Sequence, residues 1–270
     1  MRLGSDTAMD DAPADTKSQN NIESVMLTLR ILESLAASHD DKGVTQLARE
    51  LGSTKARIFR HLQTLRNLGY VAQNPQTEKN GVGARLYVLG QLAAERFNVV
   101  GAVRPAMERL RDQVHETTVF STILDRQVTI LSLLKGANPI EIGLRLGSIF
   151  DLHATAQGKI ALAYGPPAVL DSFLKQKLAR HTPHTVTDPE RLRAELQAVR
   201  GRGWATAPEE TLIGINALAA PVLGDGGKLV GALAIVGSIQ HIPAAPPRDQ
   251  IDAVVSAARL ASQNVGWLPG

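Results

Sequence analysis

The segment STKARIFRHLQTLRNLGYV, residues 53–71, carries the most informative pattern in the chain. At about 100° per residue, Ile58, Leu62 and Leu65 fall within one narrow arc of a helix. Ser53 is a suitable N-cap and Gly69 a suitable terminator, so the pattern predicts a helix that runs to about Leu68. The opposite side of this helix is polar and is formed by Ala56, Arg60, Gln63 and Asn67.

The flanking segments place this helix in a small domain. A broad apolar stripe at three- and four-residue spacing predicts a helix from Ser24 to Ala36, and Thr45 is a plausible N-cap for a short second helix that ends at Gly52. After the third helix, we expect one strand over residues 70–72 and another over residues 85–89, joined by a loop of turn-forming residues. Three helices followed by a hairpin are typical of a winged helix-turn-helix.

The outer face of the third helix predicts contact with nucleic acid. Between Leu51 and Thr77 the sequence has no acidic residue, yet it carries several basic ones. Phosphates favour positive charge, and arginine can bind guanine through two hydrogen bonds. The alternative is an ordinary solvated basic face. The expected DNA-binding residues are Ser53, Thr54, Lys55, Ala56, Arg57, Arg60 and Thr64, with Lys79 and Arg85 from the hairpin.

The rest of the chain predicts a second domain of mixed strands and helices. Residues 92–113 are interpreted as a connecting helix interrupted by Gly101 and Pro105. We then expect strands over 117–124, 129–134, 218–223 and 229–236, and helices over 153–163, 191–200 and 251–260, the second of these helices beginning with the capping pattern Thr187-x-x-Glu190. This is an α+β sheet domain. The predicted divisions are a disordered tail (1–20), a DNA-binding domain (21–90), a linker helix (91–104) and the sheet domain (105–270), to which the family resemblance given below assigns effector binding and oligomerisation.

Composition excludes several classes of protein. The chain has 270 residues, of which 44% are hydrophobic and 20% charged, which is enough to form cores. It has no cysteine, so disulfides and thiolate catalysis are excluded, and its formal net charge is only +3. Its apolar runs are too short for a membrane span, and the polar N-terminus differs from a secretory signal. We therefore expect a cytoplasmic protein without membrane contact and, since no phosphate-binding glycine motif follows a strand, without a cofactor.

The motifs resemble those of IclR-type bacterial transcriptional regulators. In the first domain the resemblance lies in TQLARELG, residues 45–52, and in KARIFRHL, residues 55–62. Residues 69–71 and 86–90 resemble the wing of that family. In the second domain it lies in LHATAQGK, residues 152–159, in Glu210 and Gly214, and in residues 219–222. The resemblance implies a winged helix-turn-helix, a GAF-like effector domain that binds a small organic molecule, and a homodimer or homotetramer on operator DNA that represses or activates.

The resemblance also implies where the effector binds. In such regulators the pocket lies over the sheet, beside the start of the helix that begins ATAQGK, and the backbone amides of residues 156–158 would be free to bind a carboxylate there. Relatives that bind very small oxo-acids have cysteine, serine or aspartate at positions that are alanine or valine here, so we expect an effector with an apolar body and one anionic end, such as an aromatic acid. The expected effector-binding residues are Phe150, Ala154, Thr155, Ala156, Gln157, Gly158, Ala207, Glu210, Ala217, Ala234 and Val236.

Other interpretations stay open. The alanines at the expected pocket could simply pack the sheet, and Arg145 could bind a ligand carboxylate or be solvated. The second domain could serve oligomerisation alone, or form an enzyme, although no converging catalytic groups are found. His181 and His184 are spaced for a metal pair, but no cysteine or carboxylate cluster accompanies them in the sequence, and we expect no metal site.

Overall fold

The structure of the chain is a computed structural model, which describes residues 22–96, 98–137 and 143–266. It divides into two compact units, Met1–Arg96 and Phe97–Gly270, each with its own core. The predicted disordered tail, residues 1–20, lies outside the described residues. Within the described residues, no helix is both long and apolar enough to cross a membrane.

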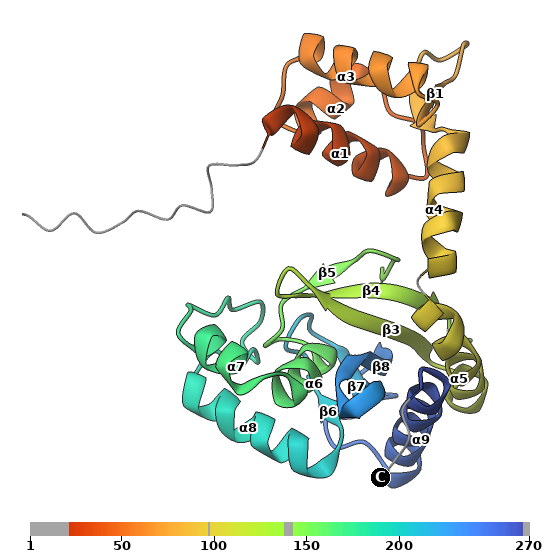
Figure 1. Cartoon of the computed structure of the whole chain (residues 1–270). Helices are drawn as coiled ribbons and strands as arrows, with labels where there is room; N and C mark the ends of the chain where they lie inside the picture. The colour runs from red at the N-terminus through yellow and green to blue at the C-terminus, as the bar shows by residue number, and fades with distance from the viewer. Residues whose placement is uncertain (1–21, 97, 138–142, 267–270) are drawn as a thin grey trace, which may run out of the picture. The chain divides into compact units, whose positions relative to one another are not determined.

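The first unit is a winged helix-turn-helix (Figure 1). Its core is closed by side chains from three helices, with Ile31, Leu47, Ile58 and Leu62 fully buried. Its small antiparallel sheet pairs Val71 with Val82, and so tests the expected hairpin directly. The elements are α1 (Glu23–Ala36), α2 (Val44–Glu50), α3 (Lys55–Asn67), β1 (Val71–Gln73), β2 (Asn80–Val82) and α4 (Ala84–Arg96).

The second strand of the wing was predicted in the wrong place. It lies at Asn80–Val82, and residues 85–89 belong to α4. The reason is the close approach of Gly83 to residues 69–71, where a side chain would overlap the backbone. The Gly83 amide donates to the Tyr70 carbonyl at 2.8 Å, and the Arg85 amide donates to the Gly69 carbonyl at 3.1 Å. The chain therefore leaves the sheet at Gly83 and enters a helix at once.

Two helix caps also differ from prediction. The second helix begins at Val44, after Gly43, and has no side-chain cap, so Thr45 lies inside it. The third helix is capped by Thr54, whose hydroxyl accepts from the Arg57 amide at 3.3 Å, and not by Ser53. In both cases a neighbouring residue takes the extended conformation that an N-cap needs.

The second unit is an antiparallel sheet between two layers of helices (Figure 1). The strand order is β5-β4-β3-β8-β7-β6. One face packs on α5 and α9, and the other packs on α6, against which α7 and α8 lie. The elements are α5 (Asn98–Val114), β3 (Thr117–Leu124), β4 (Gln127–Leu134), β5 (Ile149–Phe150), α6 (Ala156–Tyr164), α7 (Pro167–Leu174), α8 (Pro189–Arg202), β6 (Ala205–Thr206), β7 (Ile215–Leu223), β8 (Leu229–Ser238) and α9 (Arg248–Asn264).

Several predicted boundaries in this unit shift. Helix α5 continues through Gly101 and Pro105, where an interruption was expected, and the preceding helix ends at Arg96. The cap of α8 is Asp188, whose carboxylate accepts from the Arg191 amide at 2.7 Å, and not Thr187. Helix α6 starts at Ala156, three residues after the predicted start. The α+β class and the arrangement of an N-terminal helix-turn-helix before a sheet domain are confirmed.

Candidate functional site

Helix α3 presents the predicted face to solvent. Ile58, Leu62 and Leu65 are buried against α1 and α2, which fixes the rotation of the helix. The residues on the opposite side are therefore exposed, as the periodicity predicted: Lys55, Ala56, Arg60, Gln63, Thr64 and Asn67. Thr54 is exposed at the cap, whereas Ser53 and Arg57 are half-buried.

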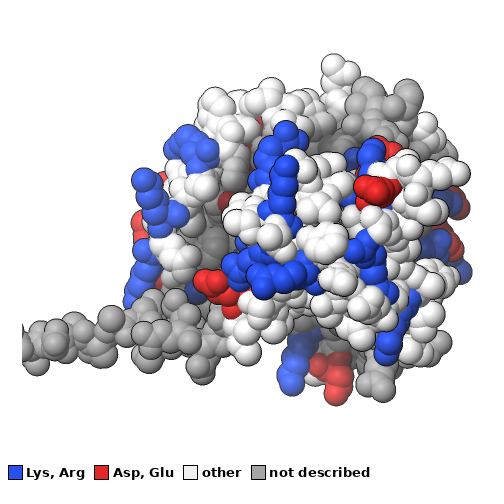
Figure 2. All heavy atoms as spheres, turned by 90° about the horizontal axis from the view of Figure 1, so that it is seen from above, with Lys and Arg blue, Asp and Glu red and all other residues white. Residues whose placement is uncertain are grey.

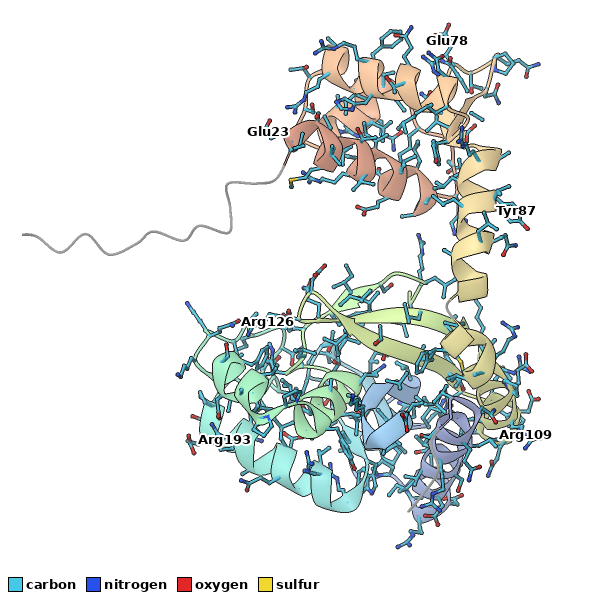
Figure 3. The ribbon with its side chains drawn as sticks, viewed as in Figure 1. Glu23, Glu78, Tyr87, Arg109, Arg126 and Arg193 are labelled. Atoms are coloured by element: carbon cyan, nitrogen blue, oxygen red, sulfur yellow. The ribbon has the colours of Figure 1, made fainter. Side chains whose placement is uncertain are left out.

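The electrostatics of this face depend on which cations already have partners. Among the described residues, no acidic side chain pairs with Lys55 or Arg60. Arg57 does pair, at 3.2 Å, with Glu23. Glu23 lies at the start of α1 (Figure 3). The Glu23 side chain is 84% exposed, so this ion pair contributes little and phosphate can replace it. Figure 2 shows basic side chains spread over this view with few acidic ones among them.

Arg66 and Arg85, near the end of α3, form hydrogen bonds and ring contacts within the first unit. Arg66 bonds the Gln73 side chain of β1 and stacks on the ring of Phe59. Arg85, expected in the wing, lies in α4, where its guanidinium donates to the Leu68 carbonyl at 3.3 Å and stacks on Tyr70. These contacts hold the wing and α4 against the end of α3. Lys79 is exposed in the wing, as expected.

His61 links the rear of α3 to α1. Its Nδ1 lies 2.8 Å from the Thr28 hydroxyl. Burial, together with the positive charges of Arg57 and Arg60, lowers the pKa of His61 below its usual value. The ring is therefore neutral at neutral pH and does not add to the basic face.

The second unit contains a cavity of about 310 Å³ at the start of α6. This volume is within the range that small-molecule sites occupy. The walls come from strands β4, β5, β7 and β8 and from the loops before α6 and β7. Eight of the expected effector-binding residues line it: Phe150, Ala154, Thr155, Ala156, Gln157, Ala207, Ala217 and Val236.

The polar groups of this cavity gather at the N-terminus of α6. The Thr155 hydroxyl caps the helix and accepts from the Gly158 amide at 3.1 Å. That bond makes the prediction of a free Gly158 amide wrong. Within the described residues, the amides of Ala156 and Gln157 have no acceptor. They leave two donors at the positive end of the helix dipole, where a carboxylate is favoured.

Two of the other polar side chains in the lining, Asn216 and Thr211, are already satisfied. The Asn216 amide group donates to the carbonyls of Ile242 and Pro243 at 2.9 and 3.1 Å, and its oxygen accepts from the backbone. The Thr211 hydroxyl donates to the Ala154 carbonyl at 2.6 Å. No ionisable side chain is found among the described lining residues, so an anionic ligand would depend on the helix amides.

Three expected effector-binding residues do not line the cavity. Gly158 packs on the Leu152 backbone, where a side chain would overlap it. Ala234 is fully buried in the core beneath α6. Glu210 turns its carboxylate away, toward Lys159 of α6 and the Val186 amide, which donates to it at 3.2 Å.

Lys159 and Glu210 form a buried ionic cluster that the sequence did not reveal. The Lys159 side chain is 0% exposed and also donates to Glu195 of α8 at 2.7 Å. Burial raises the pKa of Glu210, while the Lys159 ammonium and the Val186 amide oppose that effect. The cluster joins α6, α8 and the loop before β7, and the same loop supplies Thr211 and Leu212 to the cavity wall.

Other lining residues were also missed. Ile215 could have been found, because it precedes Ala217 by two positions and so shares its face of β7. Ile130 lies within β4 and Asn216 within β7, whereas four more come from loops, where no periodicity marks them: Gly143, Leu144, Thr211 and Leu212.

The two histidines of the Thr/Pro loop contact different carboxylates. His181 Nε2 lies 2.8 Å from Asp151, and His184 Nε2 lies 3.8 Å from Glu209. In the described part of the chain, no group of three His, Asp or Glu side chains is arranged to hold a metal ion.

Comparison with known proteins gives family matches to both units. The family described as the IclR helix-turn-helix domain matches residues 24–75, and the family described as the C-terminal part of the bacterial transcriptional regulator IclR matches residues 91–265. Among curated relatives, the HTH-type transcriptional regulator KdgR of Dickeya chrysanthemi is 26% identical over 252 residues, covering 93% of this chain and 82% of that protein.

Solved structures share the fold. An IclR transcriptional regulator from Alicyclobacillus acidocaldarius superposes with a TM-score of 0.77 at 26% identity, covering 91% of this chain and 100% of that one. An IclR homologue from Microbacterium hydrocarbonoxydans, solved with 4-hydroxybenzoate, has a TM-score of 0.79 at 22% identity and covers 90% of this chain and 98% of that one.

Proposed function

This chain belongs to the IclR family of bacterial transcriptional regulators, and from that premise we propose that it binds operator DNA through α3 and responds to a small aromatic acid bound at the start of α6. The observation that supports the DNA-binding part is the exposed face of α3, where Lys55 and Arg60 project without acidic partners among the described residues. The protein then works in the cytoplasm, on the operator of a catabolic operon.

The residues on and around the exposed face of α3 have distinct roles in this proposal. Arg60, at the middle of the face, reads bases or phosphates in the major groove, and Arg57 joins it by exchanging Glu23 for phosphate. Lys55 and Lys79 contact the sugar-phosphate backbone. The small residues Thr54 and Ala56 allow the duplex to approach the start of the helix closely.

A homodimer, or a dimer of dimers, would present two α3 helices to the operator. Exposed apolar side chains on the first unit support self-association: Val25, Met26 and Leu29 on α1, and Tyr87, Val88, Leu89 and Leu92 on α4. Tyr87 points away from the body of the unit in Figure 3. Two-fold symmetry would place the half-sites one helical turn, or a multiple of it, apart.

The effector proposal rests on the chemistry of the cavity. Two free amides at the helix start suit a carboxylate, and the mainly apolar wall suits a ring. The neighbour from Microbacterium hydrocarbonoxydans was solved with 4-hydroxybenzoate, which makes that acid a suitable first probe. Effector binding changes DNA affinity only if one arrangement of the protein binds both the acid and the DNA more tightly than another arrangement does.

Gel-shift titration with DNA flanking the gene tests the DNA-binding proposal. We expect Arg60→Ala to weaken specific binding at least tenfold, which corresponds to the loss of one good base contact. Arg109→Ala is the matched control, because Arg109 is an exposed arginine on α5 in the other unit (Figure 3). Equal affinity of the two variants would contradict the placement of the groove-reading face.

Thermal denaturation with a panel of acids tests the effector proposal separately. A ligand at 100 times its Kd stabilises the protein by about 2.7 kcal/mol, and the shift grows with the logarithm of its concentration. We expect 4-hydroxybenzoate and benzoate to stabilise the protein more than glyoxylate does. A larger shift with glyoxylate would contradict the aromatic class, and no shift with any acid would favour a second unit that only oligomerises.

A further inference from the structure

The second unit has another cavity, on the face of α6 that looks toward β3 and β8. Its volume is about 300 Å³, similar to that of the first cavity. Its walls are formed by α6, the start of α7, and strands β3 and β8. The two cavities share one described lining residue, Gln157.

Small residues on both sides create this second space. Ala161 and Gly165 follow Gln157 at four-residue intervals on α6 and at its end, so they lie on the same side of the helix. Gly231 and Ala232 of β8 stand in the opposing wall. A Cβ at Gly231 would lie 2.7 Å from the Phe120 ring, in the core on the other face of the sheet, so the space beside α6 is left by the small side chains of Ala161 and Ala232 and by Gly165.

Gln157 gives the second cavity an unused hydrogen-bonding group. Only 7% of this residue is exposed, and its side-chain amide has no hydrogen-bond partner among the described residues. Gln157 lines both cavities and its amide is not taken up by another group of the protein, so it is available to a ligand.

We propose that this second cavity binds an uncharged phenolic compound whose hydroxyl bonds the Gln157 amide. Ser121 lies on the same face of β3 as Ile123, which packs on the α6 side of the sheet, and its hydroxyl donates to the Ala232 carbonyl at 3.5 Å and keeps lone pairs that can accept. Because the described lining includes no charged residue, a carboxylate would lose its hydration without compensation. A neutral ring with one hydroxyl meets both conditions.

The site is independent of the proposed DNA binding and separate from the proposed acid site. The first cavity offers the helix amides of residues 156 and 157 to an anion, whereas the second offers only side-chain groups. The probes are therefore p-cresol, which has the ring and hydroxyl, toluene, which lacks the hydroxyl, and 4-methylbenzoate, which carries the charge.

Isothermal titration of the full chain with p-cresol tests the proposal. Ala161→Leu fills the second cavity without touching the first, and Ala217→Leu is the matched control that fills the first alone. We expect saturable p-cresol binding that Ala161→Leu weakens at least tenfold and Ala217→Leu changes less than twofold. We expect 4-methylbenzoate to show the reverse pattern.

The role of the amide has its own test. We expect Gln157→Leu to weaken p-cresol at least fivefold and to leave toluene, the weaker ligand, unchanged or tighter. If circular dichroism shows that Ala161→Leu does not fold, Val169→Phe takes its place in the comparison. Val169 lines the same cavity and is 46% exposed, so a larger side chain there narrows the cavity with less strain on the core. The proposal is overturned if p-cresol does not saturate the protein at millimolar concentration. It is also overturned if Ala217→Leu loses p-cresol binding while Ala161→Leu, or Val169→Phe in its place, retains it.

Discussion

Replacing Lys159 by methionine tests whether the buried cluster holds the second unit together. The ammonium group is fully buried, donates to Glu195 at 2.7 Å and bonds Glu210, whose side chain is 5% exposed. Methionine keeps much of the volume but leaves the Glu210 carboxylate without its cation. Breaking one side of a buried ion pair costs about 3–5 kcal/mol, since the remaining charge stays desolvated.

This loss can be converted into a melting temperature. For a unit of 150–250 residues, about 1 kcal/mol shifts Tm by roughly 2–4 °C, so Lys159→Met should lower the Tm of the unit Phe97–Gly270 by roughly 6–20 °C. Differential scanning calorimetry, followed by urea denaturation at 25 °C, measures both quantities. Lys177→Met is the matched control, because Lys177 is exposed in the loop after α7.

The double variant Lys159→Met/Glu210→Gln separates charge from packing. A neutral amide at position 210 can still accept from the Val186 amide, and Glu195 is 27% exposed and can be hydrated. We therefore expect the double variant to recover more than half of the lost stability. The reasoning is refuted if the free energy of unfolding of Lys159→Met lies within about 1 kcal/mol of the wild-type value. It is also refuted if the double variant is no more stable than Lys159→Met.

The pH dependence of the single variant provides a further check. Burial already raises the pKa of Glu210, and removing the ammonium takes away its main opposing influence. The folded variant then binds more protons than the unfolded chain between the unfolded and folded pKa values of this carboxyl. Its stability falls as pH rises through that window, so the deficit of Lys159→Met should shrink toward acid pH.

Three other substitutions are expected to have separable effects. Gly158→Ala should lower the Tm of the second unit strongly, because its Cβ would overlap the Leu152 carbonyl. Gly201→Ala is the control: its Cβ position lies in open space, so it should change stability by less than about 1 kcal/mol, and calorimetry compares the two variants. The Lys42 ammonium and the Gln46 amide lower the pKa of Glu50 to about 2, so the small contribution of this carboxylate to the stability of the first unit should be lost as pH falls from about 4.5 to 2. Glu50→Gln should flatten this part of the curve in a circular-dichroism titration. Lys55→Ala should reduce the slope of log affinity against log salt by about 1, and an unchanged slope in gel shifts would remove Lys55 from the phosphate contacts.

The first unit was largely predictable because its helices are amphipathic. The buried positions of α3 follow from the 3.6-residue period alone, and the exposed face follows from them. Residues 85–89 misled the prediction, because a short mixed segment fits a strand as well as a helix. Tertiary contacts at Gly83 decided the outcome, and no local pattern records them.

The residues that line the cavity could be predicted only where the family resemblance or the alternation of a strand pointed to them. Ala217 and Val236 were predicted from the family resemblance, and the structure shows that they pair in register on neighbouring strands and both line the cavity. Leu144 and Thr211 come from loops, whose path depends on contacts elsewhere. Lys159 and Glu210 are 51 residues apart, and a lysine inside an apolar helix gives no sign of which carboxylate it will meet.

Successive residues of α6 contact different parts of the second unit, because they point about 100° apart around the helix. Gln157 reaches both cavities, Gly158 packs on the preceding loop, and Lys159 enters the buried cluster. A ligand cannot shift α6 without disturbing that packing and that ion pair, so the helix is a rigid wall. The loop wall differs, since Leu212 and Ile213 are 54% and 55% exposed. A ligand-dependent change in the second unit should therefore begin in this loop, with Glu210 as its fixed end.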